Sequence, residues 1–207
     1  MTVVKNHQLT PLPVSFYDRD AVRVAQELLG KLLVRQSPGG RTVGRIVETE
    51  AYLAQGDPAC HATRGMTRKN ASMFGPPGRA YVYAIHARWC FNVVVQPRQV
   101  ASAVLIRAVE PLDGVPLMQQ RRGRVKPAEL TRGPARLCEA FDIDRRLDGW
   151  QLGAGRRLWI AEGHPTWLSP NHIGCSPRIG VTSAAERHLR FYVRDNPHVS
   201  GPKRWRL

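Results

Sequence analysis

The spacing of apolar and polar positions along the chain predicts more strands than helices. Apolar residues from Val22 to Leu32 recur at helical spacing after Asp18, which suits an N-cap, so a helix is expected over about residues 19–34. Pro134 suits the first turn of a second helix that runs to about Phe141. The other apolar runs are short, as buried strands are. The predicted strands cover residues 42–53, 79–85, 91–95, 103–109, 157–161 and 189–193.

Two further segments are predicted to lack regular structure. Residues 57–77 are rich in polar residues, glycine and proline, and loops of that length are usually functional or mobile. Residues 121–132 are basic and are expected to form a mobile connection. The chain has no internal repeat and no long linker. We therefore expect one α+β domain over residues 1–207, built around a curved, largely antiparallel β-sheet with few helices.

Charge narrows the choice of partner. The 207 residues include 31 Lys and Arg against 16 Asp and Glu, for a net charge of +15. This excess is spread along the chain and rich in arginine, whose guanidinium suits phosphate, so a nucleic acid is the first expectation. The alternative is that the excess of arginine reflects the composition of the source genome and not an anionic partner. Because no secretion signal is visible over Met1–Val14 and no apolar run is long enough to span a bilayer, a cytoplasmic, nucleoid-associated protein is expected.

The cysteines do not indicate a metal site. No two of Cys60, Cys90, Cys138 and Cys175 are separated by two to four residues, as the ligand pairs of zinc knuckles are. Without a secretion signal a disulfide framework is not expected either. The cysteines are predicted to be small buried hydrophobic residues.

Candidate chemistry begins in the predicted strand Ile46–Tyr52. Side chains alternate along a strand, so Glu48, Glu50 and Tyr52 share one face. Two carboxylates on one face of an otherwise apolar strand are unusual in a hydrophobic core, so this face, which also carries an aromatic ring, is a candidate functional site. The alternative is the solvated face of an edge strand.

A buried cation is predicted in another strand. Arg107 interrupts a run, Ala103–Val109, that is apolar on both faces, so its guanidinium must find a carboxylate or carbonyl partner. Glu50 is the candidate partner. A purely structural ion pair is the alternative.

Two tyrosines and a histidine complete the candidates. Tyr81 and Tyr83 share a face, and a tyrosine pair belongs either to a core or to a surface that stacks on an unstacked base. The net positive charge shifts the balance towards the second reading. His61 lies in the polar loop after the Glu50 strand, where a solvated surface residue is the alternative.

These segments occur together in one known family. The chain resembles the alkyladenine (3-methyladenine) DNA glycosylase family over nearly its whole length. The residues that carry the resemblance are Leu28–Leu33, Ile46–Tyr52, Cys60–Ala62, Met73–Gly78, Tyr81–Tyr83, Val104–Pro111, Gly133–Cys138, Arg178–Gly180 and Leu189–Arg194.

The resemblance implies roles for particular residues. Glu50 would be the general base that activates the attacking water, and Arg107 and the backbone of Ile179 would help to hold that water. In the pocket Tyr52 and Tyr83 would stack on the flipped base, and His61 would form a hydrogen bond with that base. A pocket asparagine that helps to exclude guanine would be Asn92.

The resemblance also implies the class of enzyme. Members of this family are single-domain, monofunctional glycosylases that use no metal or other cofactor. The expected activity is removal of alkylated purines of the 3-methyladenine type, and of hypoxanthine, from double-stranded DNA by a monomer. The alternative is a non-catalytic module that binds lesions or RNA.

One departure from the family concerns the side chain that fills the gap left by the flipped nucleotide. The family usually has a tyrosine three residues beyond the position of Tyr83, and here Ile85 or His86 takes that place. The other expected DNA contacts are Arg64, Arg68, Lys69, Arg88 and the basic segment 121–132.

Overall fold

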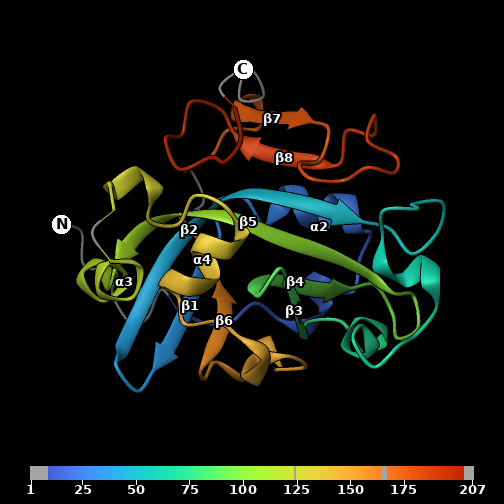
Figure 1. The fold of residues 1–207 in the computed structure, drawn as a ribbon, viewed down its shortest axis with the longest axis horizontal. Helices are drawn as coiled ribbons and strands as arrows, with labels where there is room; N and C mark the ends of the chain where they lie inside the picture. Colours follow the sequence, from blue (N-terminus) through green and yellow to red (C-terminus); the bar gives the residue numbers. More distant parts are fainter. Residues whose placement is uncertain (1–8, 124, 165–166, 203–207) are drawn as a thin grey trace.

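One antiparallel β-sheet organises the chain. The computed structural model describes residues 9–123, 125–164 and 167–202. Within them six strands follow the order β3-β4-β5-β2-β1-β6, and β8 pairs with both β2 and β7 (Figure 1). The strands are β1 (Leu32–Ser37), β2 (Gly40–Tyr52), β3 (Ala80–Ile85), β4 (Arg88–Val95), β5 (Ser102–Asp113), β6 (Leu158–Ala161), β7 (Ile173–Ser176) and β8 (Arg190–Val193). The expected α+β fold with a largely antiparallel sheet is confirmed.

Strand β2 lies at the centre of this sheet. Its first half pairs with β1, and its second half lies between β5 and β8, so that Glu50 is opposite Leu105 on one side and Arg190 on the other. The register with β5 shifts on both sides of Glu48. Because other strands pair with β2 along both of its edges, β2 is an interior strand of the sheet and not an edge strand.

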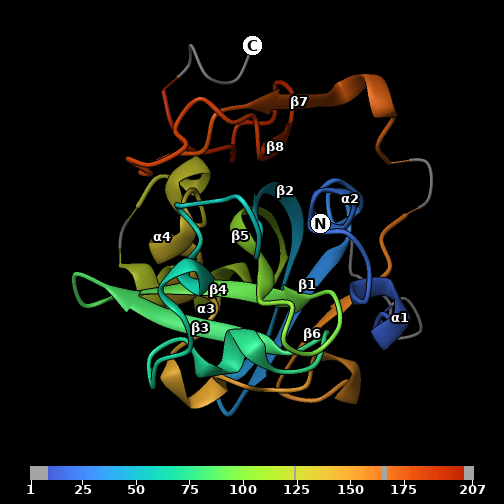
Figure 2. The ribbon, with the colours of Figure 1, turned by 90° about the vertical axis from the view of Figure 1, so that its right-hand side faces the viewer.

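Short helices cover both faces of the sheet. Figure 2 shows α2 and α4 on opposite sides of the central strands. The α-helices are α1 (Val14–Tyr17), α2 (Ala21–Glu27), α3 (Val115–Arg122) and α4 (Pro134–Ala140). The 3₁₀ segments are η2 (His61–Arg64), η3 (Ala71–Phe74), η4 (Pro127–Glu129), η5 (Arg145–Leu147), η6 (Leu152–Ala154) and η7 (Pro170–His172). The helix predicted from Pro134 is confirmed, with Pro134 in its first turn.

The first predicted helix is shorter than expected. Helix α2 begins after Asp20, whose side chain accepts a hydrogen bond from the Arg23 amide at 3.0 Å, so the N-cap is Asp20 and the assignment of Asp18 was wrong. The chain then turns at Gly30, where φ is +85°. The apolar run from Leu32 joins β1, because β2 and β6 offer it backbone partners on both edges. Tertiary pairing thus overrides the helical spacing.

Residues 121–132 were predicted as a connection without regular structure, but their described part includes the end of α3 and η4. Arg122 ends α3 and pairs with Glu139 of α4. Arg132 pairs with Glu129 at 2.6 Å and donates to the Val199 carbonyl at 3.0 Å. These contacts tie the segment to the rest of the domain on both sides of residue 124, which is not described.

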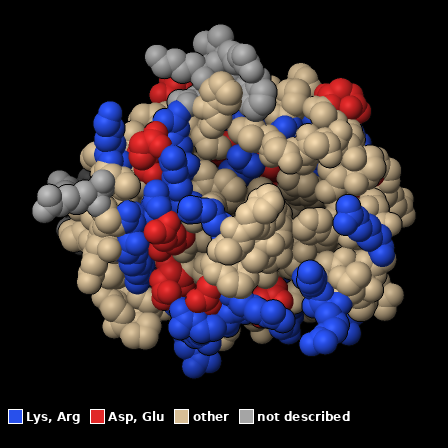
Figure 3. All heavy atoms as spheres, viewed as in Figure 1, with Lys and Arg blue, Asp and Glu red and all other residues tan. Residues whose placement is uncertain are grey.

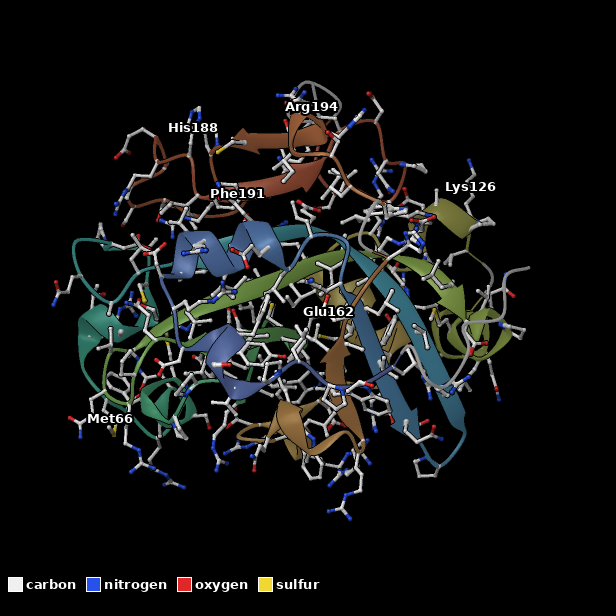
Figure 4. All side chains as sticks on the ribbon, turned by 180° about the vertical axis from the view of Figure 1, so that it is seen from behind. Met66, Lys126, Glu162, His188, Phe191 and Arg194 are labelled. Carbon is white, nitrogen blue, oxygen red and sulfur yellow. The ribbon has the colours of Figure 1, made fainter. Side chains whose placement is uncertain are left out.

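Strands β7 and β8 extend the sheet as a branch, in which β8 pairs with the second half of β2 and β7 pairs with β8. Strand β7 was not predicted. In Figure 4, Phe191 lies on the side of β8 that faces the rest of the domain, and Arg194 lies beyond it. Phe191 is buried and Arg194 is exposed. The loop between β7 and β8 contacts the end of β2 that carries Glu50, since Arg178 donates to the Ala51 carbonyl and the Ile179 amide donates to Glu50.

The cysteines follow the prediction except at one position. Cys60, Cys90 and Cys138 are buried, whereas Cys175 is exposed, and all four are free thiols. Across the three described ranges no group of three or more His, Cys, Asp or Glu side chains is placed to hold a metal ion. None of the described helices is long and apolar enough to cross a membrane.

Candidate active site

Glu48 and Glu50 are both fully buried on β2. The alternative of a solvated edge strand is therefore wrong, because β2 is flanked by β1, β5 and β8. Buried carboxylates are costly unless charged or polar groups compensate them. The side chains around the two glutamates supply that compensation, and they come from distant parts of the chain.

Three donors surround the carboxylate of Glu50. The Ile179 amide donates to Oε1 at 2.7 Å, and the Tyr52 hydroxyl donates to Oε2 at 2.9 Å. Nη1 of Arg107 lies 3.2 Å from Oε2. This is the pairing that the sequence suggested for Arg107. The carboxylate of Glu50 thus accepts from an amide and a phenol and lies beside a guanidinium, so its orientation is fixed by three groups.

The Tyr52 hydroxyl keeps its proton. Burial is the main cause that raises its pKa well above the ordinary value, and the adjacent Glu50 carboxylate raises it further. Tyr52 is thus a donor to Glu50 and holds its own ring in a fixed orientation.

Arg107 lies between the two glutamates. Nε donates to Oε1 of Glu48 at 3.1 Å, and Nη2 donates to Oγ of Ser200 at 3.3 Å. Burial would lower its pKa, but the carboxylates of Glu50 and Glu48 outweigh burial and raise the pKa. Arg107 is therefore a permanent positive charge beside Glu50.

Glu48 anchors this cluster to the end of the described chain. Its Oε1 also accepts from Nε of Arg190 at 2.7 Å and from Oγ of Ser200 at 2.9 Å, and its Oε2 accepts from the Ser200 amide at 2.7 Å. Burial opposes ionisation, but Arg107 and Arg190 together lower the pKa of Glu48 below its ordinary value. Sequence reasoning missed Arg190 and Ser200 as partners.

A second buried ion pair supports the same site. Arg178 forms a bidentate salt bridge with Asp57, in which Nη2 donates to Oδ1 at 2.6 Å and Nη1 donates to Oδ2 at 2.7 Å. Both side chains are fully buried. The guanidinium also lies 4.6 Å from the centroid of the Tyr52 ring and donates to the Ala51 carbonyl at 3.0 Å. The residue after Arg178 supplies the amide that binds Glu50. Sequence reasoning did not assign Asp57 or Arg178 a role, although Arg178 stands in a motif of the resemblance.

An aromatic pocket adjoins Tyr52. It is lined by Tyr52, His61, Met73, Tyr81, Tyr83, Asn92 and Ala103. Glu50 is not in this lining and reaches the pocket through Tyr52. The pocket has a volume of about 10 Å³, roughly the space that one water molecule needs.

His61 is held by the tyrosines of β3. The residue is exposed, but its Nδ1 lies 2.8 Å from the Tyr81 hydroxyl and its ring is 4.6 Å from that of Tyr83. Burial of the ring, and secondly the charge of Arg64, lower the pKa of His61 below 6.5. The imidazole is therefore neutral at pH 7. These contacts argue against an unattached surface residue.

Asn92 forms part of the pocket wall. Its side chain is buried, and Nδ2 donates to the Tyr81 carbonyl at 3.1 Å across the β3–β4 pair. The amide group is thus fixed in orientation. The pocket wall is rigid at this position because both partners belong to the sheet.

The predicted DNA contacts are exposed. Ile85 and Arg88 pair across the turn of the β3–β4 hairpin, which projects from the body of the domain in Figure 2. His86 and Ala87 between them have φ of 45° and 61°, as a two-residue type I′ turn requires. Ile85 is 46% exposed. Arg64 is the last residue of η2, and Arg68 and Lys69 lie on the loop after it; all three are exposed. Figure 3 shows that lysine and arginine side chains also line the lower border of one face of the molecule.

Comparison with known proteins gives a consistent result. The family model described as methylpurine-DNA glycosylase (MPG) matches residues 15–197. A curated relative from Carboxydothermus hydrogenoformans is 45% identical over 91% of this chain and 98% of its own length. Relatives from Methanocella arvoryzae and Mesorhizobium japonicum are 46% and 45% identical over 91% and 98% of this chain, and 95% and 96% of their own. All three carry the name "Putative 3-methyladenine DNA glycosylase".

Proposed function

The chain belongs to the methylpurine-DNA glycosylase family, and we propose that it hydrolyses the N-glycosidic bond of alkylated purines in double-stranded DNA. The names of the family and of its curated relatives support a substrate of the 3-methyladenine type. We include hypoxanthine as a second substrate to be tested. The observation that carries the proposal is the buried carboxylate of Glu50, which is held by Ile179, Tyr52 and Arg107 beside an aromatic pocket.

The base must leave the helix before it can react. A glycosidic bond inside a duplex is hidden by stacking, so the nucleotide has to be turned out into the pocket. Alkylation at a ring nitrogen makes the purine cationic, and the faces of Tyr52 and Tyr83 attract a cation. A neutral His61 does not repel it.

Glu50 supplies the chemistry of bond cleavage. As the bond to the base breaks, its electron pair leaves with the purine and the sugar gains oxocarbenium character. A water oxygen bonds to C1′ and passes a proton to the Glu50 carboxylate. A cationic alkylated purine departs as a neutral molecule, so one carboxylate suffices for it. Neutral hypoxanthine departs as its anion, which takes a proton from solvent water. Arg107 holds the Glu50 carboxylate in place through their 3.2 Å ion pair.

The remaining residues bind DNA or select the base. Ile85 or His86 at the hairpin tip fills the gap left by the extruded nucleotide, since apolar wedges of this kind separate base steps. Arg64, Arg68, Lys69 and Arg88 neutralise phosphates. Asn92 leaves little room for the exocyclic amino group of guanine.

The test uses the purified protein and duplexes that each carry one 3-methyladenine or one hypoxanthine, in the presence of EDTA. We expect alkali-labile abasic sites in EDTA, because the mechanism needs no metal. We expect no direct strand cleavage, because the nucleophile is water and not an amine. An undamaged duplex of the same sequence is the control. If neither lesion is released while both duplexes are bound, the protein is a non-catalytic reader instead.

A further inference from the structure

A second, larger groove adjoins the aromatic pocket beside Tyr52, which we call the base pocket. The groove has a volume of about 720 Å³ and shares His61, Tyr81 and Tyr83 with the base pocket. Its other lining residues come from three separate segments, namely η2 with the loop after it, the β3–β4 hairpin, and η5 with the residue that follows it. We call it the basic groove because four cations line it, which are Arg64, Arg68, Lys69 and Arg145.

These four cations differ from most arginines of the protein in having no partner. None of their side chains makes an ion pair or hydrogen bond with another residue in the described part of the chain. By contrast Arg146, the next residue to Arg145 on η5, pairs with Asp142 at 3.1 Å and Asp144 at 2.7 Å. Free cations gathered in a concave surface strengthen each other's attraction for an anion.

The acidic group in the basic groove is already engaged. Asp148 accepts from Oγ of Ser72 at 2.7 Å and from the Val82 amide at 2.9 Å. The Asp148 carboxylate thus binds two neutral donors of the groove wall and forms no ion pair with the four cations in the described part of the chain. Four free positive charges against this carboxylate leave the groove strongly cationic.

The loop that carries three of the cations is held in shape by a buried side chain. Asn70 accepts from the Thr67 amide at 2.6 Å and donates to the carbonyls of Gly65 and His61 at 2.9 and 3.1 Å. Because the loop is ordered before any ligand binds, less conformational entropy is lost on binding.

We propose that the basic groove binds the DNA backbone beside the extruded nucleotide, and that Arg145 of η5 contacts a phosphate there. This inference rests on the proposed function, because a base in the pocket would place its neighbours next to the shared wall of His61, Tyr81 and Tyr83. It extends the DNA-binding surface to a segment about 80 residues beyond the η2 loop.

The experiment compares two neighbouring arginines. Arg145→Gln and Arg146→Gln proteins bind a duplex with a tetrahydrofuran abasic-site analogue, which has no base to release, and affinity is measured by fluorescence anisotropy over a series of salt concentrations. For Arg145→Gln we expect about tenfold weaker binding at 0.1 M salt and a salt slope that is smaller by about 1. Arg146→Gln should leave both values unchanged. Circular dichroism checks that both variants fold.

The outcomes separate this inference from the proposed function. Equal binding by the two variants, or an unchanged salt slope for Arg145→Gln, would overturn the role of Arg145. Base release by the unaltered protein at saturating DNA tests the glycosylase activity on its own. If the protein releases no base, the binding comparison still shows whether Arg145 contacts phosphate. If the protein is active but Arg145→Gln binds DNA normally, only the proposed role of the basic groove is refuted.

Discussion

The backbone amide of Ile179 donates a 2.7 Å hydrogen bond to the carboxylate of Glu50, 129 residues earlier in the chain. Backbone donors are not altered by side-chain substitution, so this contact depends on how the chain around Ile179 is held. Asp57 and Arg178 provide that support, and they also fix Tyr52. The geometry of the site therefore rests on a few long-range contacts.

Glu50→Gln should abolish base release while leaving DNA binding intact. The glutamine amide keeps the shape of the side chain but cannot take a proton from water. We expect the single-turnover rate to fall by about 10²–10⁴-fold, the range for general base catalysis. Glu110→Gln is the control, because Glu110 pairs with Arg45 away from the pocket. A rate within threefold of the unaltered protein would remove Glu50 from the mechanism.

Arg178→Lys should slow base release more than it weakens DNA binding. Lysine keeps the charge but loses the two-pronged contact with Asp57 and the flat stacking on Tyr52. A misplaced catalytic group costs about 10²-fold in rate, so we expect a loss of that order with duplex affinity changed less than about threefold.

Arg35→Lys is the matched control for Arg178→Lys. Arg35 binds Asp142 at 2.9 Å and is likewise buried, but it lies outside the site. Both variants should lower the melting temperature. A similar fall in rate for both would assign Arg178 a purely structural role.

Arg64→Gln should raise the pKa of His61. A nearby positive charge disfavours the imidazolium, so its removal favours protonation and moves the pKa upward towards 6.5. Burial, the larger cause of the depression, remains in place. The measurement is an NMR titration of the His61 ring, with Arg68→Gln as the control. A pKa that stays the same or falls would contradict the assigned cause.

Ala87→Gly should stabilise the protein. Ala87 has φ of 61°, which glycine adopts without the steric cost that a Cβ brings. We expect the free energy of unfolding in urea to rise by about 0.5–1 kcal/mol. Ala84→Gly, on the extended part of the same hairpin, should lower it by a similar amount. A loss of stability at position 87 would show that the turn does not carry strain.

The sequence allowed Glu50, Tyr52 and Arg107 to be grouped because strand alternation and the cost of burying a cation are local rules. The same rules could not reveal Asp57 with Arg178, or Glu48 with Ser200, because those partners are 121 and 152 residues apart. Residues Leu32–Ser37 were assigned in part to a helix for a related reason. Their pairing with β6 depends on residues more than 120 positions later.

The contacts of Glu48 with Ser200 and of Glu50 with Ile179 also set the order in which the active protein can arise. A ribosome adds about 5–20 residues each second, so roughly 6–26 s of translation separate the emergence of Glu50 from that of Ile179. A nascent or truncated chain that stops short of Ile179 has Glu50 but no amide to orient its carboxylate. If the proposed function holds, incomplete translation products therefore lack the geometry that base release needs.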